Sequence, residues 1–402
     1  MTTAASDTST VAFIMKRRYS DSQGADVSMR EHPTYYEIMK TGSFDGSDFA
    51  YATVTGNPQG ISSEFASSQA GAETLKGEQF IVTTRTKYGV CTLDGVSMMK
   101  ARGNRGSFYD FVTRHMDGTL DEMGANIAFD LQRDGTGLRG RRASISGNVV
   151  TLTSKNDVDN FRRGMTIVAA QNSNGSSPRV GSAKVVKLDR AGKKITLDDQ
   201  STITSFADND FIFRKGDIGN CIEGFGACTP LASPTAGVLF RNVERTNDVE
   251  ALAGSRIDDT TVYPEEAIGN LAVQINIIGK KVSRAIVYPT VFQSMVKRLG
   301  AKVIYTSPGG AADVGFESLM IHTAGGPVRV TSDPDADSTV VRVYRPDAHE
   351  LKSIDEIVHT IKDDGNRSQR QSGNDGIEIR WRSVLNYRQP DQASHGVATF
   401  AQ

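Results

Sequence analysis

The stretch from Ser107 to Gln132 places apolar side chains at a helical spacing and constrains the fold more than any other feature. One face of such a helix is apolar and the opposite face is charged. A continuous helix here would be about 39 Å long at about 1.5 Å per residue, more than twice the usual helix length. Gly118 and Gly124 inside it each cost about 1 kcal/mol relative to alanine, so either packing stabilises the helix or the helix bends there. Its apolar positions are Phe108, Phe111, Met116, Leu120, Met123, Ile127 and Leu131.

The composition is that of a globular chain with nearly balanced charge. Hydrophobic residues make up 38% and charged residues 23%, and 402 residues suffice for two or three domains. Lys and Arg number 46 against 47 Asp and Glu, which gives a formal net charge of -1. Binding of nucleic acid through bulk positive charge is therefore not indicated, because it needs clustered excess cations.

The cysteines and the apolar runs bear on where the chain is made. Cys91, Cys221 and Cys228 form no CxxC pair, so we read them as buried small hydrophobic residues from a reducing compartment. No apolar run reaches the roughly 20 residues of a membrane span, and residues 1–30 lack a signal-peptide core. We expect a soluble protein made in a cytoplasm.

The first 91 residues predict an arm followed by a hairpin. Residues 1–30 are rich in Ser, Thr, Asp and Ala, which predicts an extended arm that becomes ordered on a partner surface. Two strand-like pieces follow, separated by the polar stretch from Ser62 to Gly77, and the second runs from Glu78 to Cys91. A hairpin with so few large apolar residues cannot make its own core, so we expect it to project and to lie on another surface.

From Ile145 to Asp217 the sequence changes to short strand-like runs between turn signals. About 70 residues of closely spaced strands predict a small β-barrel inserted between helical units. The predicted strands are Asn148–Thr153, Met165–Ala170, Ala183–Leu188, Lys194–Asp198 and Asp210–Arg214.

The remaining sequence predicts an α+β arrangement with mixed, mainly antiparallel strands. Pro264 is suited to the first position of a helix that ends near Gly279, and a second helix runs from Pro289 to Leu299. The predicted strands are Ala285–Tyr288, Phe316–His322, Val328–Thr331, Val340–Tyr344 and Ile377–Tyr387, with a hairpin around Gly325-Gly326.

This order of parts resembles the major capsid protein of tailed bacteriophages, which has the Hong Kong 97-type fold. Glu78–Met99 resembles the second strand of the family's projecting E-loop hairpin, and Ser107–Gln132 resembles its spine helix. Ala285–Pro289 with the helix to Leu299, and Phe316–Pro334, resemble two passages of its axial domain. The likeness covers nearly the whole chain, although no single motif is diagnostic.

The resemblance implies an α+β capsid fold divided into six parts. They are an N-terminal arm (1–48), the E-loop and lead-in strand (49–100), a peripheral domain with the spine helix (101–141), an inserted β-barrel (142–217), an axial domain (218–343) and a return to the peripheral domain (344–402).

The resemblance also implies a major capsid protein of the virion, assembled in the host cytoplasm without any cofactor. Its implied partners are further copies of itself in hexamers and pentamers, a portal protein at one vertex, a decoration protein in some relatives, and packaged double-stranded DNA without sequence-specific contact. No membrane partner is implied. Only a short arm precedes the hairpin, so we expect a separate scaffolding protein.

We expect the hairpin from Ser62 to Lys87 to contact the spine helix of a neighbouring subunit. The candidate contact residues are Phe49, Tyr51, Glu64, Glu73, Lys76, Arg85, Lys87, Arg102 and Arg105. Each exposed charge pair contributes about 0 to 1 kcal/mol, so repetition over a shell would supply the stability. Some relatives join an E-loop lysine covalently to a neighbour's asparagine, and Lys76 is the positional candidate for such a cross-link, although a surface lysine is the default interpretation.

Other candidate sites have weaker support. Asp333-Pro-Asp335-Ala-Asp337 resembles the start of a calcium loop, but Ser338 and Tyr344 replace the required Gly and Glu, so we predict a turn. The six histidines show no metal-ligand spacing, and we expect surface or capping roles for them. The sequence therefore names no catalytic, cofactor or metal site. The basic runs Lys16–Arg18 and Arg139–Arg142 are predicted to be solvated, with DNA or scaffold as the alternative partner.

Two other functions remain open from the sequence alone. A soluble multidomain α+β enzyme would need a cleft with convergent titratable groups, for which the sequence offers no motif. Another virion protein, such as a tail component, is disfavoured by the long helix followed by an α+β segment.

Overall fold

The computed structural model describes residues 32–42, 46–96, 99, 105–299, 319–354, 357–361, 369–370 and 375–401, with side chains in the long helix given from residue 115 onward. The chain forms two compact units. The first consists of Met1–Phe49, Thr83–Ala128 and Glu350–Asn386, and the second of Ala50–Val82, Phe129–His349 and Tyr387–Gln402. Both helices and sheets are present, so the α+β class predicted from the sequence is confirmed.

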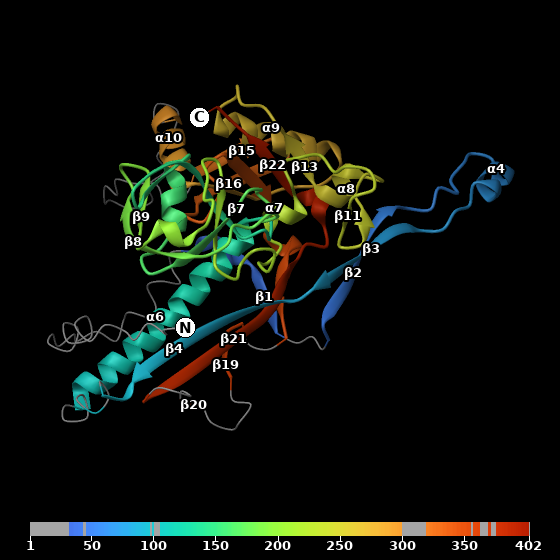
Figure 1. Ribbon diagram of the computed structural model, residues 1–402. Coiled ribbons are helices and arrows are strands. Elements are labelled where there is room, and N and C mark those ends of the chain that lie inside the picture. Colours follow the sequence, from blue (N-terminus) through green and yellow to red (C-terminus); the bar gives the residue numbers. More distant parts are fainter. Residues whose placement is uncertain are drawn as a thin grey trace, which may run out of the picture. The chain divides into compact units, whose positions relative to one another are not determined.

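The first unit contains most of the predicted long helix, α6 (Arg105–Gln132), which begins two residues before the predicted start. It lies along the antiparallel pair β4 (Arg85–Asp94) and β21 (Gly376–Arg388) (Figure 1). Cys91 and Leu93 of β4 pack with Met123 of α6 and Trp381 of β21. The rest of this unit's sheet consists of β1 (Met39–Gly42), β18 (Glu350–Ser353), β19 (His359–Thr360) and β20 (Gln369–Arg370), and the short helix α3 spans Pro33–Glu37.

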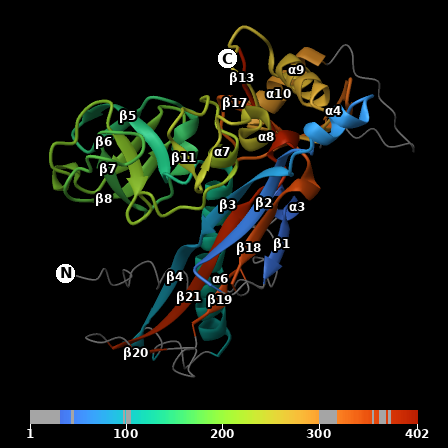
Figure 2. The same ribbon diagram turned by 90° about the vertical axis from the view of Figure 1, so that its right-hand side faces the viewer.

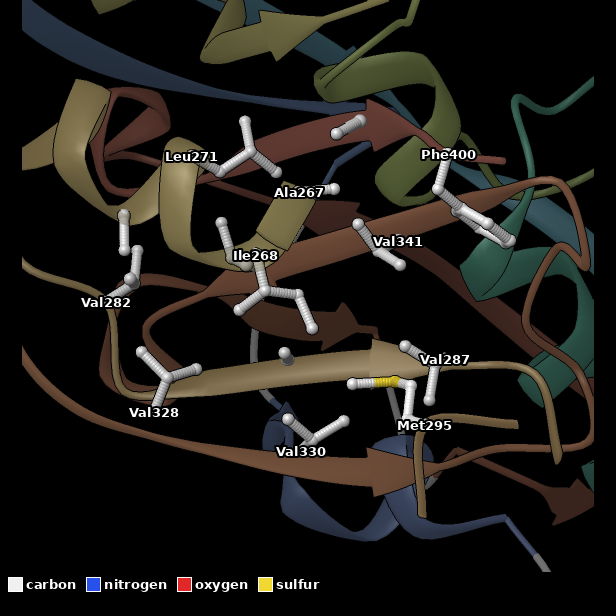
Figure 3. Close-up of a cluster of buried hydrophobic side chains, with 14 of the residues drawn as sticks. Ala267, Ile268, Leu271, Val282, Val287, Met295, Val328, Val330, Val341 and Phe400 are labelled. Atoms are coloured by element: carbon white, nitrogen blue, oxygen red, sulfur yellow. The ribbon is translucent and has the colours of Figure 1, made fainter. Parts of the chain in front are cut away.

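The second unit contains a six-stranded mixed sheet covered by two helices (Figure 2). The helices are α9 (Pro264–Ile277) and α10 (Pro289–Leu299), and both start at the predicted proline. Ile268 and Leu271 of α9 and Met295 of α10 pack on valines of the strands (Figure 3). The strand order is β13 (Ser255–Ile257), β22 (Gly396–Thr399), β17 (Val340–Tyr344), β14 (Arg284–Val287), β16 (Gly326–Ser332) and β15 (Leu319–Thr323).

The predicted small barrel is present as a closed six-stranded barrel in the second unit. The sequence identified five of its strands and missed β5 (Leu138–Ser146), which follows α6 after a short turn. The other strands are β6 (Val149–Leu152), β7 (Thr166–Ala170), β8 (Ala183–Asp189), β9 (Lys194–Leu197) and β10 (Phe211–Arg214), with 3-10 helices η1 (Asn156–Asn160) and η2 (Gln200–Thr202) between them.

The expectation that Arg139–Arg142 is a solvated basic run is wrong. Arg139 and Arg142 of β5 are buried, and only Arg141 of the three arginines is exposed. The Arg139 guanidinium donates to the carbonyl oxygen of Asn160 and lies 4.3 Å from the centre of the Phe129 ring. Arg139 also pairs with Asp217 at 3.6 Å, and Arg142 pairs with Asp208 at 3.0 Å. Carboxylates, backbone carbonyls and aromatic faces thus compensate the two buried cations within the chain.

The remaining elements of the second unit form a projecting hairpin and the turns beside its base. The hairpin consists of β2 (Asp48–Gly56) and β3 (Lys76–Thr83) with the short helix α4 (Phe65–Ala70) in its connection. The others are α7 (Phe225–Cys228), β11 (Leu239–Phe240), β12 (Val243–Glu244), α8 (Val249–Ala253), η3 (Pro346–Ala348) and η4 (Gln392–Ser394).

The end of α6 is fixed by a close approach of two backbones. Gly224, at the start of α7, lies so near the last turn of α6 that a Cβ atom there would be 2.0 Å from the carbonyl oxygen of Leu131. Gly226 is similarly close, because its Cβ would be 2.8 Å from the carbonyl carbon of Arg133. Only glycine allows this spacing, since any side chain would push one backbone away from the other.

We predict that Gly224→Ala lowers the free energy of unfolding by at least about 2 kcal/mol, because neither backbone can yield without strain. The matched control is Gly118→Ala in the exposed part of α6, where an added Cβ meets no atom within 4 Å. That control should raise helix stability by up to about 1 kcal/mol. Chemical denaturation of both variants measures the difference, and equal stabilities would contradict the assigned packing.

Candidate functional site

The connection between β2 and β3 forms the tip of the hairpin and carries the short helix α4 (Figure 1). Ile61 is 86% exposed, Phe65 is 82% exposed and Leu75 is 57% exposed. The helix α4 at this tip buries none of its residues. An isolated helix this short is not stable in water, so the rest of the connection must hold α4 in place.

The tip nevertheless has a defined local structure. The Ser68 hydroxyl donates to the carbonyl oxygen of Gly60, and the backbone N–H of Gly71 donates to the carbonyl oxygen of Ser67. A Cβ atom on Gly60 would lie 3.1 Å from Cα of Ala72, so the two ends of the connection touch there. The tip therefore presents its apolar side chains on a preformed loop, which lowers the entropy lost on binding.

The base of the hairpin is held by aromatic side chains. Tyr51 of β2 and Phe80 of β3 are buried and stack with ring centres 5.1 Å apart. Phe80 also meets Phe240 of β11 edge to face at 6.4 Å. The Thr53 hydroxyl donates to the carbonyl oxygen of Pro390, 3.0 Å away. One end of the hairpin is therefore part of a core, and the other end is exposed.

Arg241 is the polar centre of this base. Its side chain is 3% exposed, its Nε donates to Oε2 of Glu223 at 2.8 Å, and its Nη2 donates to the Glu223 carbonyl oxygen at 3.1 Å. Its own carbonyl oxygen accepts from the N–H of Ile81 in β3 at 3.0 Å. Arg241 and Asn242 both have positive φ, 51° and 68°, as the tight turn between β11 and β12 requires. A buried ion pair, a backbone bond and a strained turn thus converge on one residue.

A buried histidine pair lies in the same unit, among aromatic rings. The Nδ1 atom of His349 is 3.3 Å from Nε2 of His395, and Nδ1 of His395 is 3.0 Å from the carbonyl oxygen of Asp391. Because a carbonyl only accepts, Nδ1 of His395 carries its proton, and its Nε2 is left to accept from Nδ1 of His349. Phe225, Tyr344 and Tyr387 pack around the pair.

Both histidines are held in the neutral form. Burial lowers the pKa of His395 to about 3, and burial together with His395 lowers the pKa of His349 well below its usual value. The sequence-based expectation of surface or capping roles is therefore wrong for these two residues, which are 2% and 1% exposed. Their burial follows from the aromatic cluster, which no local spacing announces.

The predicted contact residues fall into separate environments. Glu64, Glu73 and Lys76 are exposed on the hairpin, and Glu73 and Lys76 form an ion pair at 2.8 Å that raises the pKa of the Lys76 amine. Tyr51 is buried at the base, whereas Phe49, Arg85 and Lys87 are half-buried in the first unit. Arg102 lies outside the described residues, as do the side chain of Arg105, the arm to residue 31 and the run Lys16–Arg18. Their contacts with a neighbouring subunit stay predictions, as does the division into domains.

The sequence interpretation missed the two features that define the base and the tip. Arg241 could have been suspected from the pattern Leu239-Phe240-Arg241-Asn242-Val243, because asparagine between two short apolar runs is a signal for a tight turn. The helix α4 could not, since Ser, Ala and Gln over six residues carry no helical pattern.

No family model and no curated protein matches the sequence. The structure, however, resembles a chain from the capsid of Cyanophage A-1(L), with a TM-score of 0.51 at 8% identity over 92% of this chain and 93% of that one. The chain has a phage capsid protein fold. The capsid fold predicted from the sequence is therefore confirmed. Also similar are a capsid chain of a native GTA particle (TM-score 0.48, 9% identity, 92% and 91% covered) and a chain from Mycobacterium phage Adephagia (0.45, 8%, 99% and 99%).

No group of three or more His, Cys, Asp or Glu in the described residues could hold a metal ion. None of the described helices is long and apolar enough to cross a membrane. The aspartates near Asp333 form the predicted turn between β16 and β17, where Asp333 accepts from the N–H of Asp335. Cys91, Cys221 and Cys228 are buried thiols that form no disulfide in the described residues, in line with their interpretation as buried small side chains.

We predict that Arg241→Met lowers the free energy of unfolding by about 1.5 to 3 kcal/mol, because it removes a charge-assisted hydrogen bond to the Glu223 carboxylate and a second one to the Glu223 carbonyl oxygen. The backbone N–H of Ile81 should also exchange faster with deuterium, which amide exchange measures directly. Lys76→Met is the matched control in the same hairpin, since it removes an exposed ion pair. It should change neither quantity measurably, and an Arg241→Met variant that behaves like it would contradict the role of Arg241.

Because both histidines are buried and neutral, we predict that the free energy of unfolding falls as the pH is lowered. Unfolded histidines take up protons near pH 6.5, whereas the folded His395 resists protonation down to about pH 3. Between these values the unfolded chain binds more protons, so the free energy of unfolding should fall by up to about 1.4 kcal/mol per pH unit for each histidine. Denaturation between pH 7 and pH 5 measures this slope. The variant His349→Gln/His395→Gln should lose most of it, and an unchanged slope would exclude the pair as its source.

Proposed function

We propose that this chain is the major capsid protein of a tailed bacteriophage, which self-assembles into the icosahedral shell around the genome. The observation that carries the proposal is a phage capsid fold over nearly the whole chain together with a hairpin that exposes its apolar tip. A shell needs contacts between unlike patches of identical chains, because such contacts form rings and curved lattices. An exposed tip on a firmly held base suits one side of such a contact.

In this mechanism the hairpin tip lies on a neighbouring subunit and is covered there. Burial of Ile61 and Phe65 side chains stabilises each contact by about 1.5 to 3 kcal/mol per residue. The charged residues Glu64, Glu73 and Lys76 then set the register, with smaller contributions because exposed pairs are screened. The surface that receives the tip is proposed to be the spine helix α6 of the neighbour, with Arg102 and Arg105 near its start. Phe49, Arg85 and Lys87 would contribute next to it.

The partners follow from the same proposal. Copies of the chain form hexamers and pentamers, a scaffolding protein guides the first assembly, and a portal protein occupies one vertex. The shell encloses double-stranded DNA without reading its sequence, and a decoration protein on the outer surface is a further partner. Assembly takes place in the host cytoplasm, and the mature location is the virion. The capsid fold and the apolar tip support these assignments ahead of a soluble enzyme.

We predict that deletion of Ser63 to Leu75 gives a folded chain that forms no shells, since α4 and the exposed side chains of Phe65 and Leu75 are removed while the base stays. The chain would be expressed with and without its scaffolding protein and imaged by negative-stain electron microscopy. Shells of normal diameter from the deleted chain would contradict the proposed role of the tip.

Point variants sharpen this test. Ile61→Ser/Phe65→Ser removes the apolar groups without changing the length of the connection, and it should also abolish shells. Val180→Ser is the matched control, because Val180 is 76% exposed on the barrel and lies far from the hairpin in sequence. The control should assemble normally. If the wild-type chain stays a monomer or dimer under every condition, the capsid proposal itself is wrong.

A further inference from the structure

The barrel and the rest of the chain carry opposite net charge. Residues 138–217 contain fourteen Lys and Arg but only eight Asp and no Glu, a net charge of +6. Because the whole chain has a net charge of -1, the remaining residues carry -7. A charge separation of this size within one chain favours association of unlike surfaces.

The exposed cations of the barrel gather on the hairpin formed by β8 and β9. Its side chains Lys184, Lys187, Lys193 and Lys194 are exposed, and none forms an ion pair with a carboxylate of the described residues. A register shift between Val185 and Lys187 turns the two successive residues Val186 and Lys187 outward. We call these four lysines the cationic hairpin. It combines free ammonium groups with an exposed valine.

An acidic surface lies on the sheet side of the same unit, in residues 244–266. This segment has seven carboxylates and two arginines, a net charge of -5. Both arginines are directed at backbone: Arg245 donates to the carbonyl oxygens of Ala227 and Cys228, and Arg256 to those of Ala253 and Gly254. Among the carboxylates, Glu250, Asp258 and Glu266 are exposed, and none of these three has a cationic partner in an ion pair within the described residues.

The two surfaces do not neutralise each other within one chain. Figure 1 shows β8 and β9 on the side of the barrel away from α8, which lies in the acidic segment, and Figure 2 shows the same for β8. The only ion pair of the acidic segment with a described cation outside it is that of Glu265 with Arg298 of α10. Each surface is thus available to another molecule.

We propose that the cationic hairpin of one copy binds the acidic segment 244–266 of a second copy. This inference rests on the proposed capsid function and adds a second inter-subunit contact, separate from the hairpin tip. Since the two surfaces are unlike, the contact is heterologous and leads to rings rather than to a closed two-fold dimer. Lysines interleaved with an exposed valine suit a protein carboxylate surface, whereas recognition of single-stranded nucleic acid would add aromatic stacking platforms, and the cationic hairpin has none.

Charge reversal in both surfaces tests the contact. Lys187→Glu/Lys194→Glu and Glu250→Lys/Glu266→Lys should each lower the fraction of protein in particles by about tenfold or more at about 0.15 M salt, because like charges then face each other. An equal mixture of the two variants should assemble again, since each variant's altered surface then meets a complementary surface on the other. Lys215→Glu is the control on the same barrel, where Lys215 donates to Ser182 just before β8, at the end away from the turn.

The outcomes separate this inference from the function on which it rests. Particles from Lys187→Glu/Lys194→Glu at wild-type yield, or a mixture that stays unassembled while both variants melt at the wild-type temperature, would overturn it. Normal assembly with weakened binding of a DNA duplex in a gel-shift assay would overturn it in favour of nucleic acid. Should a reversed variant fail to fold, Lys187→Gln/Lys194→Gln and a salt titration of wild-type assembly replace it. In both, fewer particles support the contact and an unchanged yield overturns it. A wild-type chain that forms no particles would remove the capsid function as well.

Discussion

The hairpin depends on a buried cation that lies well away from it in sequence. Arg241 bonds to Glu223, reaches the Tyr51 hydroxyl at 3.5 Å and accepts from the backbone of β3 through its own carbonyl oxygen. Desolvating a guanidinium costs several kcal/mol, which only nearly complete pairing offsets. The turn that holds it is strained at two positive φ angles, so the surrounding core must impose it. A rigid base of this kind holds a tip that has no core of its own, as the proposed contact with a neighbouring subunit requires.

Stability and assembly therefore use different parts of the chain. Aliphatic packing between α9, α10 and the mixed sheet stabilises the second unit without any partner. In the proposed shell, the hairpin tip and the charged surfaces would gain free energy only between copies, where apolar area would be covered and opposite charges would meet. On this proposal, substitutions in the packed core should lower the stability of the chain, whereas substitutions in the tip or the charged surfaces should lower particle formation at constant stability. The proposed contacts can therefore be tested by measuring the stability of the chain and the yield of particles separately.

The sequence predicted those elements whose signals are local. The long helix, the helix from Pro289 to Leu299 and most barrel strands follow from apolar periodicity, prolines and turn residues close together in the chain. Strand β5 was missed because its arginines interrupt the apolar alternation, and they become buried only through distant carbonyls and rings. The buried histidine pair and the Arg241 site likewise need residues more than forty or a hundred positions apart. A pattern of neighbouring residues cannot show which distant residues will meet in the folded chain.

Acid acts in opposite directions on two parts of the second unit. The histidine pair resists protonation and so loses stability as the pH falls below 6.5. Asp157 of the barrel behaves oppositely, because burial raises its pKa to about 6 although Arg133 opposes the shift. Its folded form binds a proton more readily than its unfolded form, so its contribution to stability grows as the pH falls through about 6. Mild acid should thus weaken the core around the histidines while it relieves a buried charge beside the barrel.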